Sequence, residues 1–339
     1  MDQPTFQIVA AVLFGLAVLH TFAAKAIDAL GHRLPRHAGL FHLLGEVEVV
    51  FGFWAMILML TMALMVGGTT AIDYAESRHY TEPLFVFVVM VVAASRPILE
   101  TVRALIATIA RALPIRTTLV QVWLCLAAVP LLGSLITEPA AMTLAALMLA
   151  PTVFRPGVPE KLRYAALGVL FVNISIGGTL TSYAAPPVLM VATAWSWDTA
   201  FMLETFGWRS AAAVVINASV ISLLLRRHLA DADDDAPQPK AVPIGVSAVH
   251  FAFLAGVVLF AHHPVIFIGL FLFFLGYTQA YERHQNPLIL KEGLLVGFFL
   301  AGLVVLGGMQ QWWLQPIVSG MGPDLLFFGA LALTAITDN

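Results

Sequence analysis

The feature that most constrains this chain is the stretch 133–142, where a carboxylate and a proline separate two apolar runs. The runs, 119–132 and 140–150, are each roughly 11–14 residues long, whereas a helix needs about 20 residues to cross a bilayer. Irregular backbone is tolerated at membrane depth only where it lines a cavity or is buried in protein. The pattern therefore predicts a re-entrant hairpin with Glu138 at its tip, and a carboxylate in that position is a candidate functional group.

The same short pattern recurs at the end of the chain. Ile-Thr followed by an acid occupies 136–138 and again 336–338, the second time after the apolar run 325–333. Two acid-tipped hairpins in one membrane chain are typical of a duplicated unit. Because the chain stops at Asn339, inside the second tip, we expect this sequence to lack the returning arm and a second broken helix, roughly 60–90 residues by analogy with the first half.

Composition supports a membrane protein. Of 339 residues, 60% are hydrophobic and 11% are charged, against about 25% charged in soluble domains. The single cysteine, Cys125, excludes a disulfide within this sequence and a cysteine-based metal site. The first residues lack the basic region of a cleavable signal, and no basic patch suited to nucleic acid is present. The apolar runs predict membrane segments at 6–27, 40–66, 84–112, 162–194, 211–225, 244–261, 265–277 and 294–306.

The positions of lysine and arginine predict the orientation. Nearly all of those that lie in loops fall in one set, at 25–38, 111–116, 152–163, 226–243 and 281–292. The opposite loops, at 67–82, 195–208 and 309–322, contain only Arg78. By the positive-inside rule the first set is cytoplasmic and the N-terminus is outside. The two hairpins then enter from opposite sides, as inverted repeats require.

A second polar interruption lies within the apolar run 162–194. Two adjacent glycines, Gly177 and Gly178, each cost about 1 kcal/mol relative to alanine in a helix interior and allow the helix to unwind. Unwinding would free backbone carbonyls, and oxygen-only ligand sets suit hard cations. The alternative is a glycine packing contact whose nearby hydroxyls bond to backbone. The surrounding hydroxyls and amide belong to Asn173, Ser175, Thr179, Thr181 and Ser182.

The stretch 133–142, together with Gly-Gly-Thr-Leu-Thr-Ser-Tyr-Ala-Ala-Pro-Pro at 177–187, resembles the ion transporter superfamily. That group includes NhaD-type sodium/proton antiporters, arsenite-pump membrane subunits, citrate carriers and divalent anion/sodium symporters. Within it, Ile-Thr-Glu-Pro-Ala-Ala and Ile-Thr-Asp-Asn are most similar to a bacterial family described as putative sodium/proton antiporters. The resemblance implies an all-α polytopic membrane protein with two inverted-topology repeats, each with a re-entrant hairpin and a discontinuous transmembrane helix.

The resemblance also implies a division of the chain and a set of ion-binding residues. The first repeat would be 1–229, with its hairpin tip near 134–139 and its broken helix near 173–187. A cytoplasmic acidic linker, 230–243, would lead to a second repeat at 244–339 that is incomplete at its tip. Relatives suggest a homodimer in the bacterial inner membrane. One half-site would comprise Thr137, Glu138, Asn173, Gly177, Gly178, Thr179 and Thr181, and the other would begin with Thr337, Asp338 and Asn339.

We expect a secondary transporter that exchanges Na+ for H+, with Na+ at Glu138, Asn173 and Thr179 as the transported ion and no cofactor. A carboxylate can hold a proton or coordinate a cation but not both well, so competition at one group would couple the two fluxes. A Na+- or H+-coupled carrier of a small carboxylate or oxyanion is the alternative, and Arg96 favours it. An enzyme is disfavoured because paired-histidine metal motifs and nucleophile motifs are missing.

Other charged residues in the apolar segments leave two interpretations open. Arg96, Glu100 and Arg103 share one helix face, as an ion-paired cluster or with Glu100 as a proton relay and Arg96 as a surrogate for a bound cation. Glu46 and Glu48 lie two residues apart, about 200° around a helix, so at most one faces a given cavity. One of them is a candidate for a proton pathway.

Overall fold

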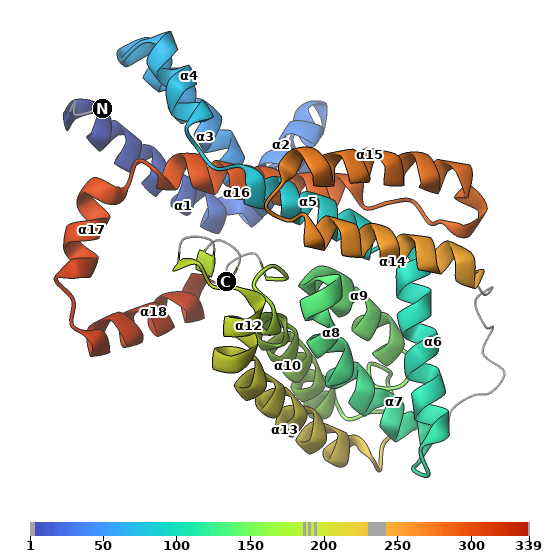
Figure 1. The fold of residues 1–339 in the computed structure, drawn as a ribbon. Coiled ribbons are helices and arrows are strands. Elements are labelled where there is room, and N and C mark those ends of the chain that lie inside the picture. The colour runs from blue at the N-terminus through green and yellow to red at the C-terminus, as the bar shows by residue number, and fades with distance from the viewer. Residues whose placement is uncertain (1–3, 186–187, 189–190, 193–194, 230–241, 338–339) are drawn as a thin grey trace. The chain divides into compact units, whose positions relative to one another are not determined.

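The computed structural model describes residues 4–185, 188, 191–192, 195–229 and 242–337, and every regular element in these ranges is helical (Figure 1). Within them, five helices are long and apolar enough to cross a membrane, and two bent helix pairs pass the same test jointly. The prediction of an all-helical polytopic membrane protein is confirmed at this level. The chain packs as two compact units, Phe85–Leu290 and a unit formed by Met1–Leu84 with Lys291–Asn339.

The first unit combines the two ends of the chain. Its helices are α1 (Pro4–Arg33), α2 (Ala38–Leu44), α3 (Val47–Met65), α4 (Gly68–Glu76), most of α16 (Leu290–Gly307), α17 (Gln311–Ser319) and α18 (Pro323–Thr337), with a 3-10 turn η1 (Pro35–His37). The fully buried Leu58, Met62 and Leu306 lie in its core. Helices α3 and α16 approach backbone to backbone at Gly52 and Gly302, where any side chain would collide with the facing chain. Small residues at a helix contact allow such an approach.

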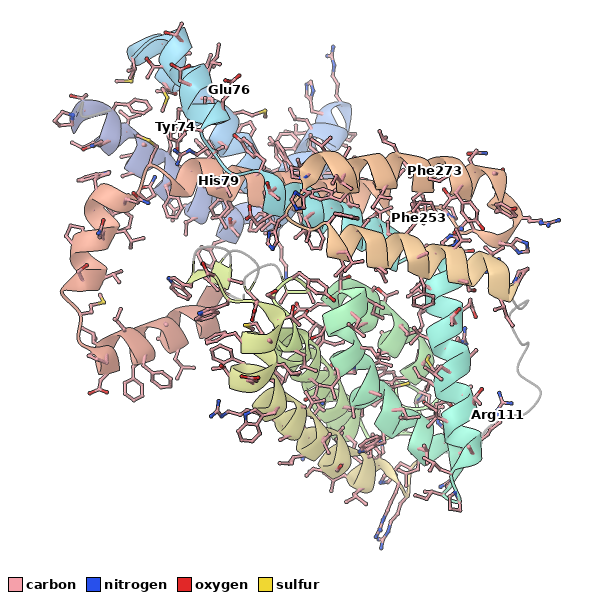
Figure 2. All side chains as sticks on the ribbon, in the orientation of Figure 1. Tyr74, Glu76, His79, Arg111, Phe253 and Phe273 are labelled. Atoms are coloured by element: carbon pink, nitrogen blue, oxygen red, sulfur yellow. The ribbon has the colours of Figure 1, made fainter. Side chains whose placement is uncertain are left out.

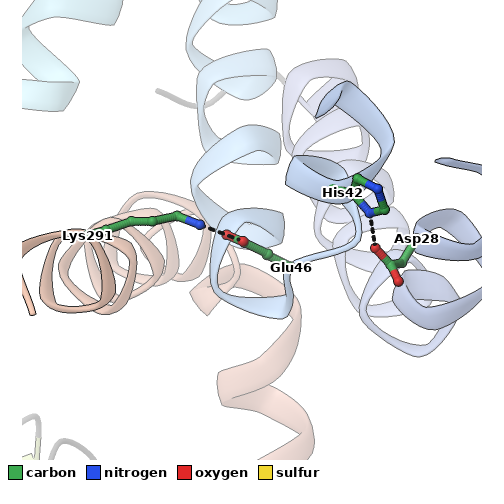
Figure 3. A network of polar contacts seen from close by, with 4 residues as sticks. All are labelled: Asp28, His42, Glu46 and Lys291. Carbon is green, nitrogen blue, oxygen red and sulfur yellow. Dashed lines mark hydrogen bonds and ion pairs between the residues drawn. The ribbon is translucent and has the colours of Figure 1, made fainter. Parts of the chain in front are cut away.

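Polar contacts fix the ends of these helices (Figure 3). His42 Nδ1 lies 2.6 Å from Asp28 Oδ1, and Lys291 Nζ lies 3.0 Å from Glu46 Oε1. The apolar segment predicted at 40–66 is interrupted in the structure. Helix α2 ends at Leu44, and Glu46 is the residue before α3 and not a residue within an apolar helix.

The second unit holds the predicted first hairpin and the broken helix. Its elements are the greater part of α5 (Thr81–Ala93), α6 (Arg96–Ala112), α7 (Thr117–Leu126), α8 (Ala128–Ile136), α9 (Glu138–Leu149), α10 (Glu160–Gly177), η2 (Gly178–Leu180), α12 (Thr199–Met202), the π-helical turn η3 (Leu203–Gly207), α13 (Trp208–Leu225), α14 (Ile244–Leu259), α15 (Pro264–Ala280) and η4 (Glu282–His284). Figure 1 shows α8 and α9 side by side, with α10 next to α8. Aromatic rings join α14 to α15, among them Phe253 and Phe273 at 5.6 Å between centroids (Figure 2).

Helix breaks occur near Pro97 and at Gly177, as the sequence predicts, and also at Ala127, within the apolar run 119–132 that the sequence predicts to be one arm. Helices α5 and α6 meet at 60° around Ser95 and Pro97, and α7 and α8 meet at 42° at Ala127. Ser95 is extended and Pro97 lies in the first turn of α6, where its missing N–H is tolerated, so the proline favours the start of a new helix over the continuation of α5. Helix α10 ends at Gly177 and is followed by a single 3-10 turn.

Three segments predicted as loops contain helices. The segment 67–82 contains α4, 309–322 contains α17, and 195–208 contains α12 and η3, which continue into α13. A search for long apolar runs misses short amphipathic helices, because their polar residues lower the average hydropathy. The aromatic stretch in 195–208 forms one cluster, with Trp197 stacked on Phe201 at 5.0 Å and tilted against Trp195 at 4.8 Å. The predicted acidic linker lies almost wholly outside the described residues, and the division into repeats stays a prediction.

Candidate functional site

The tip of the predicted hairpin is a single strained residue. Thr137 joins α8 to α9 with φ 74° and ψ 152°, a region that β-branched residues almost never adopt and that costs on the order of 1–3 kcal/mol. The turn brings the two helices into contact, so that a Cβ on Gly133 would lie 3.3 Å from Ala141 Cβ. Thr137 is 2% exposed, and its hydroxyl has no hydrogen-bond partner among the residues that the structure describes.

The carboxylate of Glu138 lies against the broken helix. A Cβ built on Gly178 would be 2.5 Å from Glu138 Oε1 and 3.2 Å from Cδ, so the carboxylate occupies the space that the glycine leaves open. The side chain is half-buried. Within the part of the chain that the structure describes, no group donates a hydrogen bond to this carboxylate and no cation pairs with it. The predicted proximity of Glu138 to the glycine pair is therefore observed.

Ser134 fastens α8 to the helix break through three hydrogen bonds. Its hydroxyl donates to the Gly177 carbonyl at 2.6 Å and accepts from the Leu180 amide at 3.1 Å. Its own carbonyl accepts from the Thr181 hydroxyl at 2.8 Å. Ser134 is 2% exposed, so these bonds satisfy backbone groups that the break would otherwise leave unpaired in an apolar environment.

Gly177 is required by a backbone contact. A Cβ at this position would lie 2.5 Å from the carbonyl oxygen of Pro130 in α8. The two adjacent glycines therefore make room for different things, Gly177 for the backbone of the hairpin and Gly178 for the side chain of Glu138. The packing interpretation therefore describes Gly177, and the ion-site interpretation of the glycine pair stays a prediction.

Asn173 lies one turn before the break and is fully buried. Its Nδ2 donates to the carbonyls of Leu126 at 2.8 Å and Val214 at 3.3 Å, and its Oδ1 accepts from Asn217 Nδ2 at 3.0 Å. The Leu126 carbonyl belongs to the last residue of α7, before the bend at Ala127. Asn173 thus links α7, α10 and α13 and compensates for the interrupted helix.

The hydroxyls of the broken segment are mostly engaged within the protein. Thr179 Oγ1 donates to the Ile176 carbonyl and lies 2.7 Å from Ser210 Oγ. Thr181 is 6% exposed and binds Ser134, as described above. Of the predicted oxygen ligands near the break, Glu138 and Thr137 are the ones whose side-chain oxygens have no partner among the described residues.

Sequence reasoning singled out neither Ser134 nor Asn217. Ser134 lies in the stretch 133–142 but carries no charge, and Asn217 is an isolated amide in the apolar helix α13. A buried amide or hydroxyl inside an apolar helix is the signal that could have found them, because such groups seek hydrogen-bond partners in neighbouring helices.

Other predicted site residues lie elsewhere. Glu46 and Glu48 belong to the first unit, where Glu46 pairs with Lys291 and Glu48 is exposed. Arg96 and Glu100 lie on α6, and Glu100 forms no ion pair within 4 Å in the described residues. The side chain of Thr337 and the whole of Asp338 and Asn339 lie outside what the structure describes, so the second half-site stays a prediction.

Comparison with curated proteins gave no match for this sequence. Comparison with family models gave one that covers residues 5–339, described as "Putative Na+/H+ antiporter". This match covers both apolar halves of the chain, including the Glu138 hairpin and the broken helix α10. The chain is therefore a multi-pass membrane protein that belongs to the putative Na+/H+ antiporter family, a family of transporters.

Proposed function

We propose that this protein exchanges Na+ for H+ and that both ions compete for the carboxylate of Glu138. The observation that carries the proposal is the unpaired carboxylate at the tip of an apolar hairpin, against the break in α10. The family description supports the choice of ions. Na+ and H+ are transported substrates here and not resident cofactors.

Competition follows from the cost of an isolated charge in an apolar environment. An ionised carboxylate without a partner is strongly disfavoured there, and it is neutralised either by a proton or by a bound cation. One group cannot hold both occupants well. Each entry of Na+ therefore releases a proton, and each protonation releases Na+, without direct contact between the ions.

The oxygen set around Glu138 suits a hard cation such as Na+. Glu138 supplies the charge, and the Thr137 hydroxyl, buried without a partner in the described part of the chain, is available as a neutral ligand. Asn173 and Thr179, included in the sequence-based Na+ site, use their polar atoms to hold helices together. We therefore propose that Glu138 and Thr137 contact the ion and that Asn173 and Thr179 position the elements around it.

Alternating access would follow from the inverted-repeat topology, with the N-terminus outside and a homodimer in a bacterial inner membrane. The recurrent Ile-Thr-acid pattern and the distribution of lysine and arginine support this part of the proposal. In it, the re-entrant hairpin α8–α9 and a second hairpin that begins with α18 carry one half-site each.

The test uses everted membrane vesicles that contain the full chain and a pH-sensitive dye. Addition of Na+ should collapse a preformed proton gradient, and Glu138→Gln, which keeps the shape and removes the titratable charge, should abolish the response. Glu160→Gln makes the same change at an exposed position at the start of α10 and should have no effect. Antiport that survives Glu138→Gln would disprove the role of this residue, and a response to a dicarboxylate in place of Na+ would favour the anion carrier.

Thr137→Val tests the neutral ligand. Valine keeps the β-branched shape and replaces the hydroxyl with a methyl group, and that hydroxyl has no hydrogen-bond partner within the described ranges. We expect unchanged protein stability and a higher Na+ concentration for half-maximal exchange. If the Na+ dependence stays as in the unaltered protein, the hydroxyl does not contact the ion.

A further inference from the structure

A pocket of about 650 Å³ with polar and apolar walls lies within the first unit. Its size falls in the range of small-ligand sites, about 300–1,000 Å³. Residues from α1, from α4 and the turn after it, and from the segment 308–319 form its walls, so the pocket involves no residue of the hairpin α8–α9. Its polar and aromatic lining includes Gln7, Tyr74, Arg78, Trp312, Gln315 and Ser319.

Arg78 is the charged residue of this lining, and its guanidinium is held in place. Its Cζ lies 4.5 Å from the centre of the Tyr74 ring, and Nη2 donates to Ser77 Oγ at 3.0 Å. A Cβ on Gly308 would lie 2.7 Å from Arg78 Nη1, so this glycine leaves the space that the guanidinium fills. Figure 2 shows Tyr74 on α4, from which the chain leads directly to Arg78.

The positive charge of Arg78 is not neutralised within the described residues. No carboxylate lies within 4 Å of it, and its Nε is buried without a hydrogen-bond partner. Tyr74 does not compensate, because burial raises the pKa of its phenol to about 12 and its hydroxyl donates to the Val305 carbonyl at 2.6 Å. A fixed guanidinium that lines the pocket and whose charge has no counterpart favours an oxyanion, to which it offers both charge and N–H donors.

The remaining walls suit an oxyanion with an apolar stem. Glutamines and serine supply neutral donors, and among the described residues no acidic one lines the space. Trp312, Met309 and Pro316 add an apolar side, and tryptophan is typical of the membrane–water boundary. Arg78 is also the one arginine or lysine of the loops predicted to lie outside, which favours recognition of a single anionic group over a general attraction by many charges.

We propose that this pocket binds a phosphate group through Arg78, and that its source is the headgroup of an anionic membrane lipid. The phosphate would accept hydrogen bonds from the guanidinium and from the glutamines, with the acyl chains leaving along the apolar side. Free inorganic phosphate could accept the same hydrogen bonds, and the experiment below distinguishes it from the lipid headgroup. The proposal does not depend on which ions the protein transports.

The experiment uses the full chain purified in detergent and measures lipid retention by native mass spectrometry. The probes are phosphatidylglycerol, a diacylglycerol with the same acyl chains and no phosphate, and inorganic phosphate at millimolar concentration. We expect retention of phosphatidylglycerol over diacylglycerol, about tenfold weaker in Arg78→Ala, since a charged hydrogen-bond pair is lost. Arg209→Ala is the matched control, because Arg209 also stacks on an aromatic ring, Trp208 at 4.8 Å, outside the pocket.

Two further variants keep the proposal testable if Arg78→Ala does not fold. Arg78→Lys retains the charge but loses the two-pronged geometry, and Gln315→Leu removes a neutral donor; each should weaken retention by a smaller factor. Arg78-dependent stabilisation by inorganic phosphate without lipid retention would assign the site to free phosphate and refute the lipid source. Equal retention by the unaltered protein and every Arg78 variant, or equal retention of diacylglycerol, would overturn the proposal.

Discussion

Replacement of either adjacent glycine at the helix break by alanine should impair the protein, but in two different ways: Gly178→Ala should reduce ion exchange, and Gly177→Ala should reduce stability. In Gly178→Ala the new Cβ would meet Glu138 Oε1 at 2.5 Å. Ordinary carbon contacts are about 3.5–4.0 Å, so the carboxylate must move by about 1 Å. A flexible side chain makes this shift at a cost of about 1 kcal/mol. A displacement of that size at a binding group can lower a rate on the order of a hundredfold.

Gly177→Ala should act on stability instead. Its Cβ would lie 2.5 Å from the Pro130 carbonyl oxygen, and backbone in the middle of α8 cannot rotate away. Overpacking of this kind costs about 1–3 kcal/mol, which corresponds to a melting temperature lower by roughly 2–10 °C. Both glycines have φ near the helical value, −65° and −68°, so alanine adds no backbone strain at either position.

The assay compares both variants in detergent melting curves and in Na+-driven proton exchange by everted vesicles. Gly168→Ala is the control, since an added methyl there meets open space on the same helix. We expect Gly178→Ala to melt within a few degrees of the control and to lose exchange, and Gly177→Ala to melt earlier than both. Normal exchange by Gly178→Ala, or an equal drop in melting temperature for both variants, would refute the assignment of separate roles.

Three further changes test other contacts. Ser134→Ala should cost about 1–3 kcal/mol of unfolding free energy, because it leaves a carbonyl and an amide at the break unpaired; an unchanged melting temperature would show that this link is not needed. Asn173→Leu should destabilise more than Asn217→Leu, because Asn173 joins three helices through three bonds, and melting curves that rank them the other way would contradict this. The raised pKa of Tyr74, about 12 against 10 when unfolded, means that the folded state keeps a proton that the unfolded state releases. Stability should therefore fall between about pH 10 and pH 12, and Tyr74→Phe should remove this part of the pH dependence while losing about 1 kcal/mol at neutral pH.

The sequence predicted the interruptions of helices better than the contacts made at them. Proline, paired glycines and a carboxylate inside apolar runs are local signals, and they placed the breaks near Pro97, Gly177 and Thr137 correctly. The helix α4 was missed, because a search for long apolar runs treats a short helix with polar residues as a loop. Asn173 was predicted as an ion ligand on its residue type alone, whereas its amide bonds to helices distant in the chain.

The amino-acid sequence by itself determined that this is a multi-pass helical membrane protein with an acid between two short apolar arms. Hydropathy and helix-breaking residues act over a few neighbouring positions, so they can be recognised in the sequence without knowledge of the tertiary structure. Only the tertiary structure decided which polar groups are free. Ser134 hydrogen-bonds to backbone groups of the break, and Thr179 and Asn173 also have hydrogen-bond partners. Glu138 and Thr137 have none among the residues that the structure describes. Hydrogen-bond satisfaction depends on residues brought together from α7, α8, α10 and α13, and no local pattern encodes that pairing.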